Sequence, residues 1–88
     1  MFAKNEVWPL ASNLEVCIAI IQLLNRKGPQ IPSKIEISII TKADMIRKCL
    51  DLLTEQGIIE KTTNHKNQET YENTERGKRI LKLFRVKF

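Results

Sequence analysis

Three short patterns, each a serine or threonine followed three positions later by an acidic residue, divide the first part of this chain. They begin at Ser12, Ser33 and Thr41. In such a capping box, the hydroxyl oxygen and the acidic side chain satisfy backbone N–H groups that the first turn of a helix leaves unpaired. The chain is therefore predicted to start a helix three times between residues 12 and 41, which excludes one long helix and an all-β fold.

Two glycines indicate where the first and third of these helices end. Gly28, followed by a proline, stops the first helix, and Gly57 stops the third, because glycine favours the left-handed conformation found just after a helix. The predicted helices span residues 13–27, 34–40 and 42–56, and residues 30–32 are long enough only for a very short strand or an extended link.

The remainder of the chain predicts a hairpin and a last helix. Two β-prone runs, residues 58–62 and 69–73, flank a polar loop at residues 63–68, as expected for two antiparallel strands. Thr74 then caps a helix over residues 75–86.

The order of these elements indicates the fold class. It is helix, short strand, helix, helix, strand, strand, helix: mainly α with a β-hairpin. A short helix, a tight turn and a longer helix form a helix-turn-helix, here residues 34–56, and the hairpin at residues 58–73 is its wing. We expect a single winged helix-turn-helix domain over the 88 residues, with residues 1–12 as an N-terminal extension.

The composition fits an ordinary small globular domain. Hydrophobic residues make up 42% and charged residues 28% of the chain, and the formal net charge is +5. From Arg76 to the end the chain carries basic residues and no acidic one, which suits a polyanionic partner. No apolar run approaches the ~20 residues that cross a bilayer, and the first residues do not form a secretory signal. We therefore expect no membrane association and a cytoplasmic location.

The scarcity of cysteine and histidine argues against a metal-binding site. Cys17 and Cys49 are far apart in sequence and His65 is the one histidine, whereas a structural zinc site takes about four close ligands. We expect two buried free thiols, with a disulfide as the alternative. No glycine-rich phosphate loop, carboxylate pair or Cys/His dyad is visible. The prediction is no enzyme, no metal, no cofactor and no small-molecule ligand.

Two motifs carry a family resemblance that extends from Lys34 to Leu83. They are LDLLTEQGII, residues 50–59, and YENTERGKRIL, residues 71–81. The chain resembles small archaeal and archaeal-virus winged-helix regulators. This resemblance implies a dimeric regulator of transcription that binds double-stranded DNA, in the host cytoplasm if the source is a virus. The chain departs from the family in having no long C-terminal coiled-coil helix.

The candidate DNA-binding residues follow from the way a helix-turn-helix docks, with its second helix entering the major groove N-terminal end first. Arg47 is the first choice for reading a guanine edge, and Lys66 is the first choice at the wing tip. The full set is Lys34, Thr41, Lys42, Met45, Arg47, Lys48, Lys61, His65 and Lys66. The alternative is an ordinary solvated surface, in which Arg47 and Lys48 form ion pairs along their own helix.

The first helix is apolar on too many sides for an isolated monomer. One stripe is expected to face the core: Leu14, Cys17, Ile18, Ile21 and Leu24. A second stripe, with Phe84 of the last helix, is the expected homodimer interface: Val16, Ala19, Ile20 and Leu23. The alternative is that apolar residues of the N-terminal extension cover this second face within one chain.

Together these observations predict a sequence-specific transcription regulator that inserts residues 42–56 into the major groove. The wing, at residues 61–68, would lie on the adjacent backbone or minor groove. Two other functions stay open. One is a winged-helix module for protein–protein contact, and the other is a non-specific architectural DNA binder.

Overall fold

Four helices and one hairpin, in the predicted order, form the part of the chain that this computed structural model describes, residues 13–84. The elements are α1 (Asn13–Lys27), α2 (Pro32–Ser38), α3 (Ala43–Glu55), β1 (Ile59–Thr63), β2 (Glu69–Asn73) and α4 (Glu75–Phe84). The predicted fold class, mainly α with a hairpin, is confirmed. The predicted N-terminal extension, the first capping box at Ser12 and residues 85–88 lie outside the described residues.

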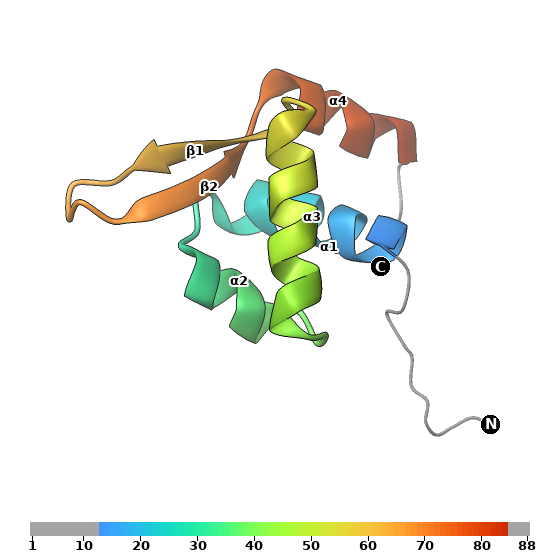
Figure 1. The fold of residues 1–88 in the computed structure, drawn as a ribbon. Coiled ribbons are helices and arrows are strands. Elements are labelled where there is room, and N and C mark those ends of the chain that lie inside the picture. Colours follow the sequence, from blue (N-terminus) through green and yellow to red (C-terminus); the bar gives the residue numbers. More distant parts are fainter. Residues whose placement is uncertain (1–12, 85–88) are drawn as a thin grey trace.

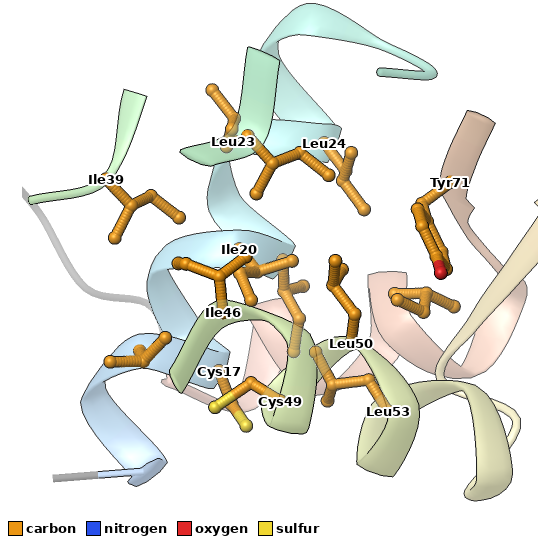
Figure 2. Close-up of a cluster of buried hydrophobic side chains, with 14 residues drawn as sticks. Cys17, Ile20, Leu23, Leu24, Ile39, Ile46, Cys49, Leu50, Leu53 and Tyr71 are labelled. Carbon is orange, nitrogen blue, oxygen red and sulfur yellow. The ribbon is translucent and has the colours of Figure 1, made fainter. Parts of the chain in front are cut away.

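Helix α1 is the centre of the domain. It packs against α2, α3, α4 and β2, and Figure 1 shows α3 crossing in front of it while the hairpin projects away from the body. The core draws a fully buried isoleucine from each of four elements: Ile20, Ile35, Ile46 and Ile59. Figure 2 shows how side chains of α1 and α3 meet in this core.

The apolar pattern of α3 is confirmed and that of α1 is corrected. Ile46, Leu50 and Leu53 of α3 are buried, as their spacing predicts. On α1, however, Leu14 is 61% exposed although it was expected in the core.

The predicted outer stripe of α1 lies inside the domain. Val16, Ile20 and Leu23 are buried in the core cluster, and Ala19 is half-buried against it. The prediction that this stripe forms an exposed dimer face is therefore wrong for these three side chains. The physical reason is the central position of α1, whose neighbours cover it on several sides. The side chain of Phe84 is outside the described part of the structure.

The capping boxes predicted for α2 and α3 do not form. Helix α2 begins earlier, with Ile31 as its N-cap and Pro32 in its first turn, and no side chain caps it. Proline stabilises this position because its φ angle is already helical and it has no N–H to satisfy. Helix α3 begins after Lys42, again without a side-chain cap, rather than at Thr41.

The predicted glycine stops are confirmed. Gly57 has a φ of +73°, and its N–H donates to the carbonyl oxygen of Thr54 at 3.0 Å. The N–H of Ile58 donates to the carbonyl oxygen of Leu53 at 2.9 Å, which completes a Schellman motif. This motif turns the chain directly from the end of α3 into the wing.

The wing is a two-stranded antiparallel hairpin in which Lys61 lies opposite Tyr71. The extended link before α2 forms a β-bridge to the edge of β2 that does not pair with β1. Gln30 and Tyr71 exchange backbone hydrogen bonds of 3.0 and 2.8 Å. The short strand predicted at residues 30–32 is thus reduced to one bridging residue, and this bridge ties the middle of β2 to the segment before α2.

The return from the wing into α4 depends on two small residues, Thr74 and Gly77. Thr74 caps α4, because its Oγ1 accepts the N–H of Gly77 at 3.3 Å. A Cβ atom at Gly77 would lie 2.5 Å from the carbonyl oxygen of Ile58, so only glycine allows α4 to pack this closely. Both residues belong to the second motif noted above.

Candidate nucleic-acid interface

Helix α3 presents a largely polar face to solvent because Ile46, Leu50 and Leu53 point into the core, although Leu52 is 45% exposed. The exposed polar residues of this helix are Asp44, Arg47, Lys48, Asp51 and Glu55. Lys42, just before the helix, is exposed as well. Lys42, Arg47 and Lys48 therefore stand in the first half of this face beside one acidic residue, Asp44, and the acidic Asp51 and Glu55 lie toward its end.

Two candidates from the same region are less accessible. Thr41 is half-buried in the turn before α3, and its N–H donates to the carbonyl oxygen of Ile39 at 3.0 Å. Met45 is also half-buried and packs against the core, which corrects the expectation that it reaches outward. Lys34 is exposed on α2. Of the predicted site residues in this region, Lys34, Lys42, Arg47 and Lys48 keep exposed cationic side chains.

Arg47 has a partner that sequence spacing did not reveal. Its Nε lies 3.9 Å from Oε2 of Glu36 on α2, whereas the sequence pointed to an ion pair within the same helix. Glu36 was assigned only to the capping box of α2. No sequence signal indicates the contact, because it depends on how α2 and α3 pack.

The tip of the wing is held by one asparagine. Oδ1 of Asn64 accepts the N–H groups of Lys66 and Gln68, each at 2.9 Å. The N–H of Asn67 donates to the carbonyl oxygen of Asn64 at 3.0 Å, and Asn67 adopts a φ of +66°. This is a tight turn followed by a left-handed residue, a common hairpin connection. His65 and Lys66 lie exposed on this turn.

Lys61 is exposed on β1, nearer the base of the wing than the tip. The wing candidates Lys61, His65 and Lys66 are therefore all accessible. In Figure 1 the wing leaves the C-terminal end of α3 and extends to one side of it. The structure thus provides two separate polar, partly cationic features: the free face of α3 and the tip of the wing.

The two thiols are buried in the core, away from solvent, and Cys49 lies on the inward side of α3. Cys17 and Cys49 are buried free cysteines, and Figure 2 shows their sulfur atoms side by side between α1 and α3. Burial, then a hydrogen bond to Cys49 and its charge, raises the pKa of Cys17 from 9.0 to about 12. A thiol with this pKa stays protonated near neutral pH and is a poor nucleophile.

Within residues 13–84, no group of three or more His, Cys, Asp or Glu side chains is arranged to hold a metal ion. None of the helices described over these residues is long and apolar enough to span a membrane.

The comparisons with known proteins concern both the sequence and the fold. A family model described as "Winged helix-turn-helix" matches residues 12–87. None of the curated proteins compared with the chain matches it.

Two solved structures share the fold. A point variant of ZitR from Lactococcus lactis superimposes with a TM-score of 0.73 and 17% sequence identity, covering 91% of this chain. The present chain spans 56% of that protein. The ferric uptake regulator Fur from Helicobacter pylori, described as having three functional metal-binding sites, gives a TM-score of 0.55 and 14% identity, covering 93% of this chain and 88% of its own.

Proposed function

Because the chain belongs to the winged helix-turn-helix family, we propose that it is a transcription regulator that binds specific sites in double-stranded DNA. The observation that carries this proposal is the solvent-exposed polar face of α3, whose first half holds three exposed cations and one acidic residue, together with a cationic wing tip. A helix of this kind fits the major groove of B-DNA.

The charges on α3 determine which part of the helix can enter the major groove of DNA. Lys42, Arg47 and Lys48 suit phosphates or base edges, whereas Asp51 and Glu55 would be repelled by phosphates. We therefore place the N-terminal half of α3 in the groove. There Arg47 reads a guanine through its O6 and N7 atoms, while Lys34 and Thr41 contact the backbone.

The wing supplies the second contact. Lys66 and His65 stand at its exposed tip and Lys61 farther back, so the tip meets the adjacent backbone or minor groove. Contacts of this kind give affinity and salt dependence rather than a choice of sequence.

A homodimer completes the proposal, with an interface revised from the sequence expectation. Leu14 of α1 is 61% and Leu83 of α4 is 82% exposed. Figure 1 places the start of α1 and the end of α4 at the same end of the molecule. A two-fold axis there would hide these apolar side chains and present two recognition helices to an inverted repeat.

A second function, protein–protein contact, is favoured by a different surface. Ile37 at the end of α2 and Ile40 in the following turn are 80% and 89% exposed. Large exposed apolar side chains that lie near each other suit a protein partner. The mixed charge of α3 is also compatible with this use.

Selection of bound duplexes separates these functions. The purified protein is mixed with a random duplex library at two salt concentrations, and the retained DNA is sequenced. Enrichment of an inverted repeat, with affinity that falls as salt rises, is the expected result. Retention without enrichment would indicate an architectural binder, and no retention at low salt would leave the protein–protein module.

Two variants in the same experiment test whether α3 and the wing tip form the DNA interface. The double variant Arg47→Ala, Lys66→Ala is expected to weaken retention strongly. Lys82→Ala removes one exposed cation near the end of α4, away from the wing tip in Figure 1, and is expected to have little effect. Equal losses for both would contradict an interface on α3 and the wing.

A further inference from the structure

The ion pair between α2 and α3 joins the base-reading candidate to a side chain of another helix. Nε of Arg47 lies 3.9 Å from Oε2 of Glu36. Glu36 follows Ile35, which is fully buried and fixes α2 against the core. The carboxylate therefore stands on a well-anchored helix, and its side chain is only 30% exposed, compared with 68% for Arg47.

We propose that Glu36 is a positioning residue that sets the base preference of Arg47. This inference rests on the proposed DNA binding. The contact engages Nε of the guanidinium group, so both Nη atoms remain available as donors. A guanine offers two acceptors, O6 and N7, to such a two-donor fork.

The benefit of Glu36 is orientation. An exposed arginine has many rotamers, and fixing one of them on binding costs affinity. A carboxylate 3.9 Å from Nε attracts the guanidinium group and favours rotamers on the α2 side before DNA arrives. An exposed ion pair has little influence on folding stability. Variants of Glu36 should therefore stay folded, and a change in their base preference can be measured separately from any loss of stability.

The negative charge of Glu36 has a second consequence. An arginine beside a carboxylate attracts a phosphate less strongly, because the carboxylate partly cancels its field. Glu36 thus favours contact of Arg47 with a base edge over contact with the backbone. Arg47→Ala is accordingly expected to change base preference more than the salt dependence of binding.

The test compares base preferences in duplex selection for the wild type and a set of variants. Arg47→Ala identifies the position at which guanine preference is lost. At that position, Glu36→Ala and Glu36→Gln are expected to lower the preference for guanine about three- to fivefold, as for loss of an exposed ion pair, with other positions unchanged. In the Arg47→Ala background, Glu36→Ala should have no further effect.

A matched control is present in the chain. Lys78 and Glu75 form an ion pair of similar length, 3.8 Å, within α4, and Glu75→Ala should leave every base preference unchanged. Thermal unfolding of each variant establishes that it is folded at the temperature of the selection.

Several outcomes would overturn the role of Glu36. They are an unchanged guanine preference in the Glu36 variants, an equal change at all positions, or tighter binding without altered preference. If these occur while Arg47→Ala still abolishes one guanine, the proposed function stands and only this inference fails. If the wild type retains no DNA at low salt, both fail together.

Discussion

Arg76, in the first turn of α4, donates from Nη1 to the backbone carbonyl oxygen of Gln56 at 2.6 Å. Gln56 is the C-cap of α3, so this bond joins the end of α3 to the start of α4. Thr74 reinforces the junction, because its Oγ1 donates to the carbonyl oxygen of Gly57 at 2.7 Å. The wing begins and ends at this junction, which therefore fixes its direction relative to α3.

Removing the Arg76 side chain should loosen this junction. Arg76→Ala is expected to lower the free energy of unfolding by about 1 kcal/mol, because the carbonyl group loses a charged donor. Arg79→Ala, which removes another exposed arginine of α4, is the control and should change stability by less than about 0.5 kcal/mol. Urea unfolding of the two variants measures the difference. Equal values would mean that the Gln56 contact contributes nothing.

A methyl group at Gly77 should be more costly. Gly77→Ala is expected to destabilise the domain by about 2 kcal/mol, because the new Cβ would lie 2.5 Å from the carbonyl oxygen of Ile58. Gly28→Ala separates this clash from backbone strain, since a Cβ there meets nothing within 4 Å although φ is +81°. We expect about 1 kcal/mol for Gly28→Ala. A smaller loss for Gly77→Ala than for Gly28→Ala in the same denaturation experiment would contradict this account.

The sequence was sufficient where one local signal determined the structure. The buried stripe of α3, including Ile46 and Leu50, follows from helical spacing, and Gly57 stops α3 because few other residues tolerate its positive φ. The capping box at Ser33 failed because Pro32, one residue earlier, already starts the helix. Here two local signals competed, and the proline determined the boundary.

The sequence was insufficient where the outcome depended on three-dimensional packing. Val16 and Ile20 read as an outer stripe of α1, yet both are 0% exposed. A periodic pattern gives the faces of a helix but not the number of neighbours that cover them. The contact of Glu36 with Arg47 was missed for the same reason, since it joins two helices across a turn.

The wing tip should contribute a salt-dependent share of DNA affinity, if the proposed function is correct. Lys66→Ala is expected to weaken binding to all duplexes about equally and to lower the slope of log affinity against log salt by about 1, as for loss of one phosphate contact. Titrations at several salt concentrations measure this slope. The result would be contradicted by an unchanged slope, or by a base preference that shifts with Lys66.

The buried thiol of Cys17 should make the fold sensitive to alkali. Its pKa is raised from 9.0 to about 12 by burial and by Cys49, so the folded state keeps a proton that the unfolded state loses above about pH 9. Stability from this group is therefore complete below pH 9 and falls as pH rises toward 12, by at most about 1.4 kcal/mol per pH unit.

Comparison with Cys17→Ala isolates this effect from other groups that titrate in alkali. The variant should be less stable at pH 7, because it loses buried volume. The difference in melting temperature between wild type and variant should then narrow from pH 8 to pH 11. A difference that stays constant over this range would exclude a role for the Cys17 proton.

The wing tip separates the residue that shapes the turn from the residues that it displays. Asn64 holds the backbone of Lys66 and Gln68 through its own side chain, whereas the side chains of His65 and Lys66 are exposed. Positions 65 and 66 can therefore exchange one side chain for another during evolution without altering the loop that carries them. A chain of this design can change the charge and chemistry displayed at its wing tip by mutation while its fold is inherited unchanged.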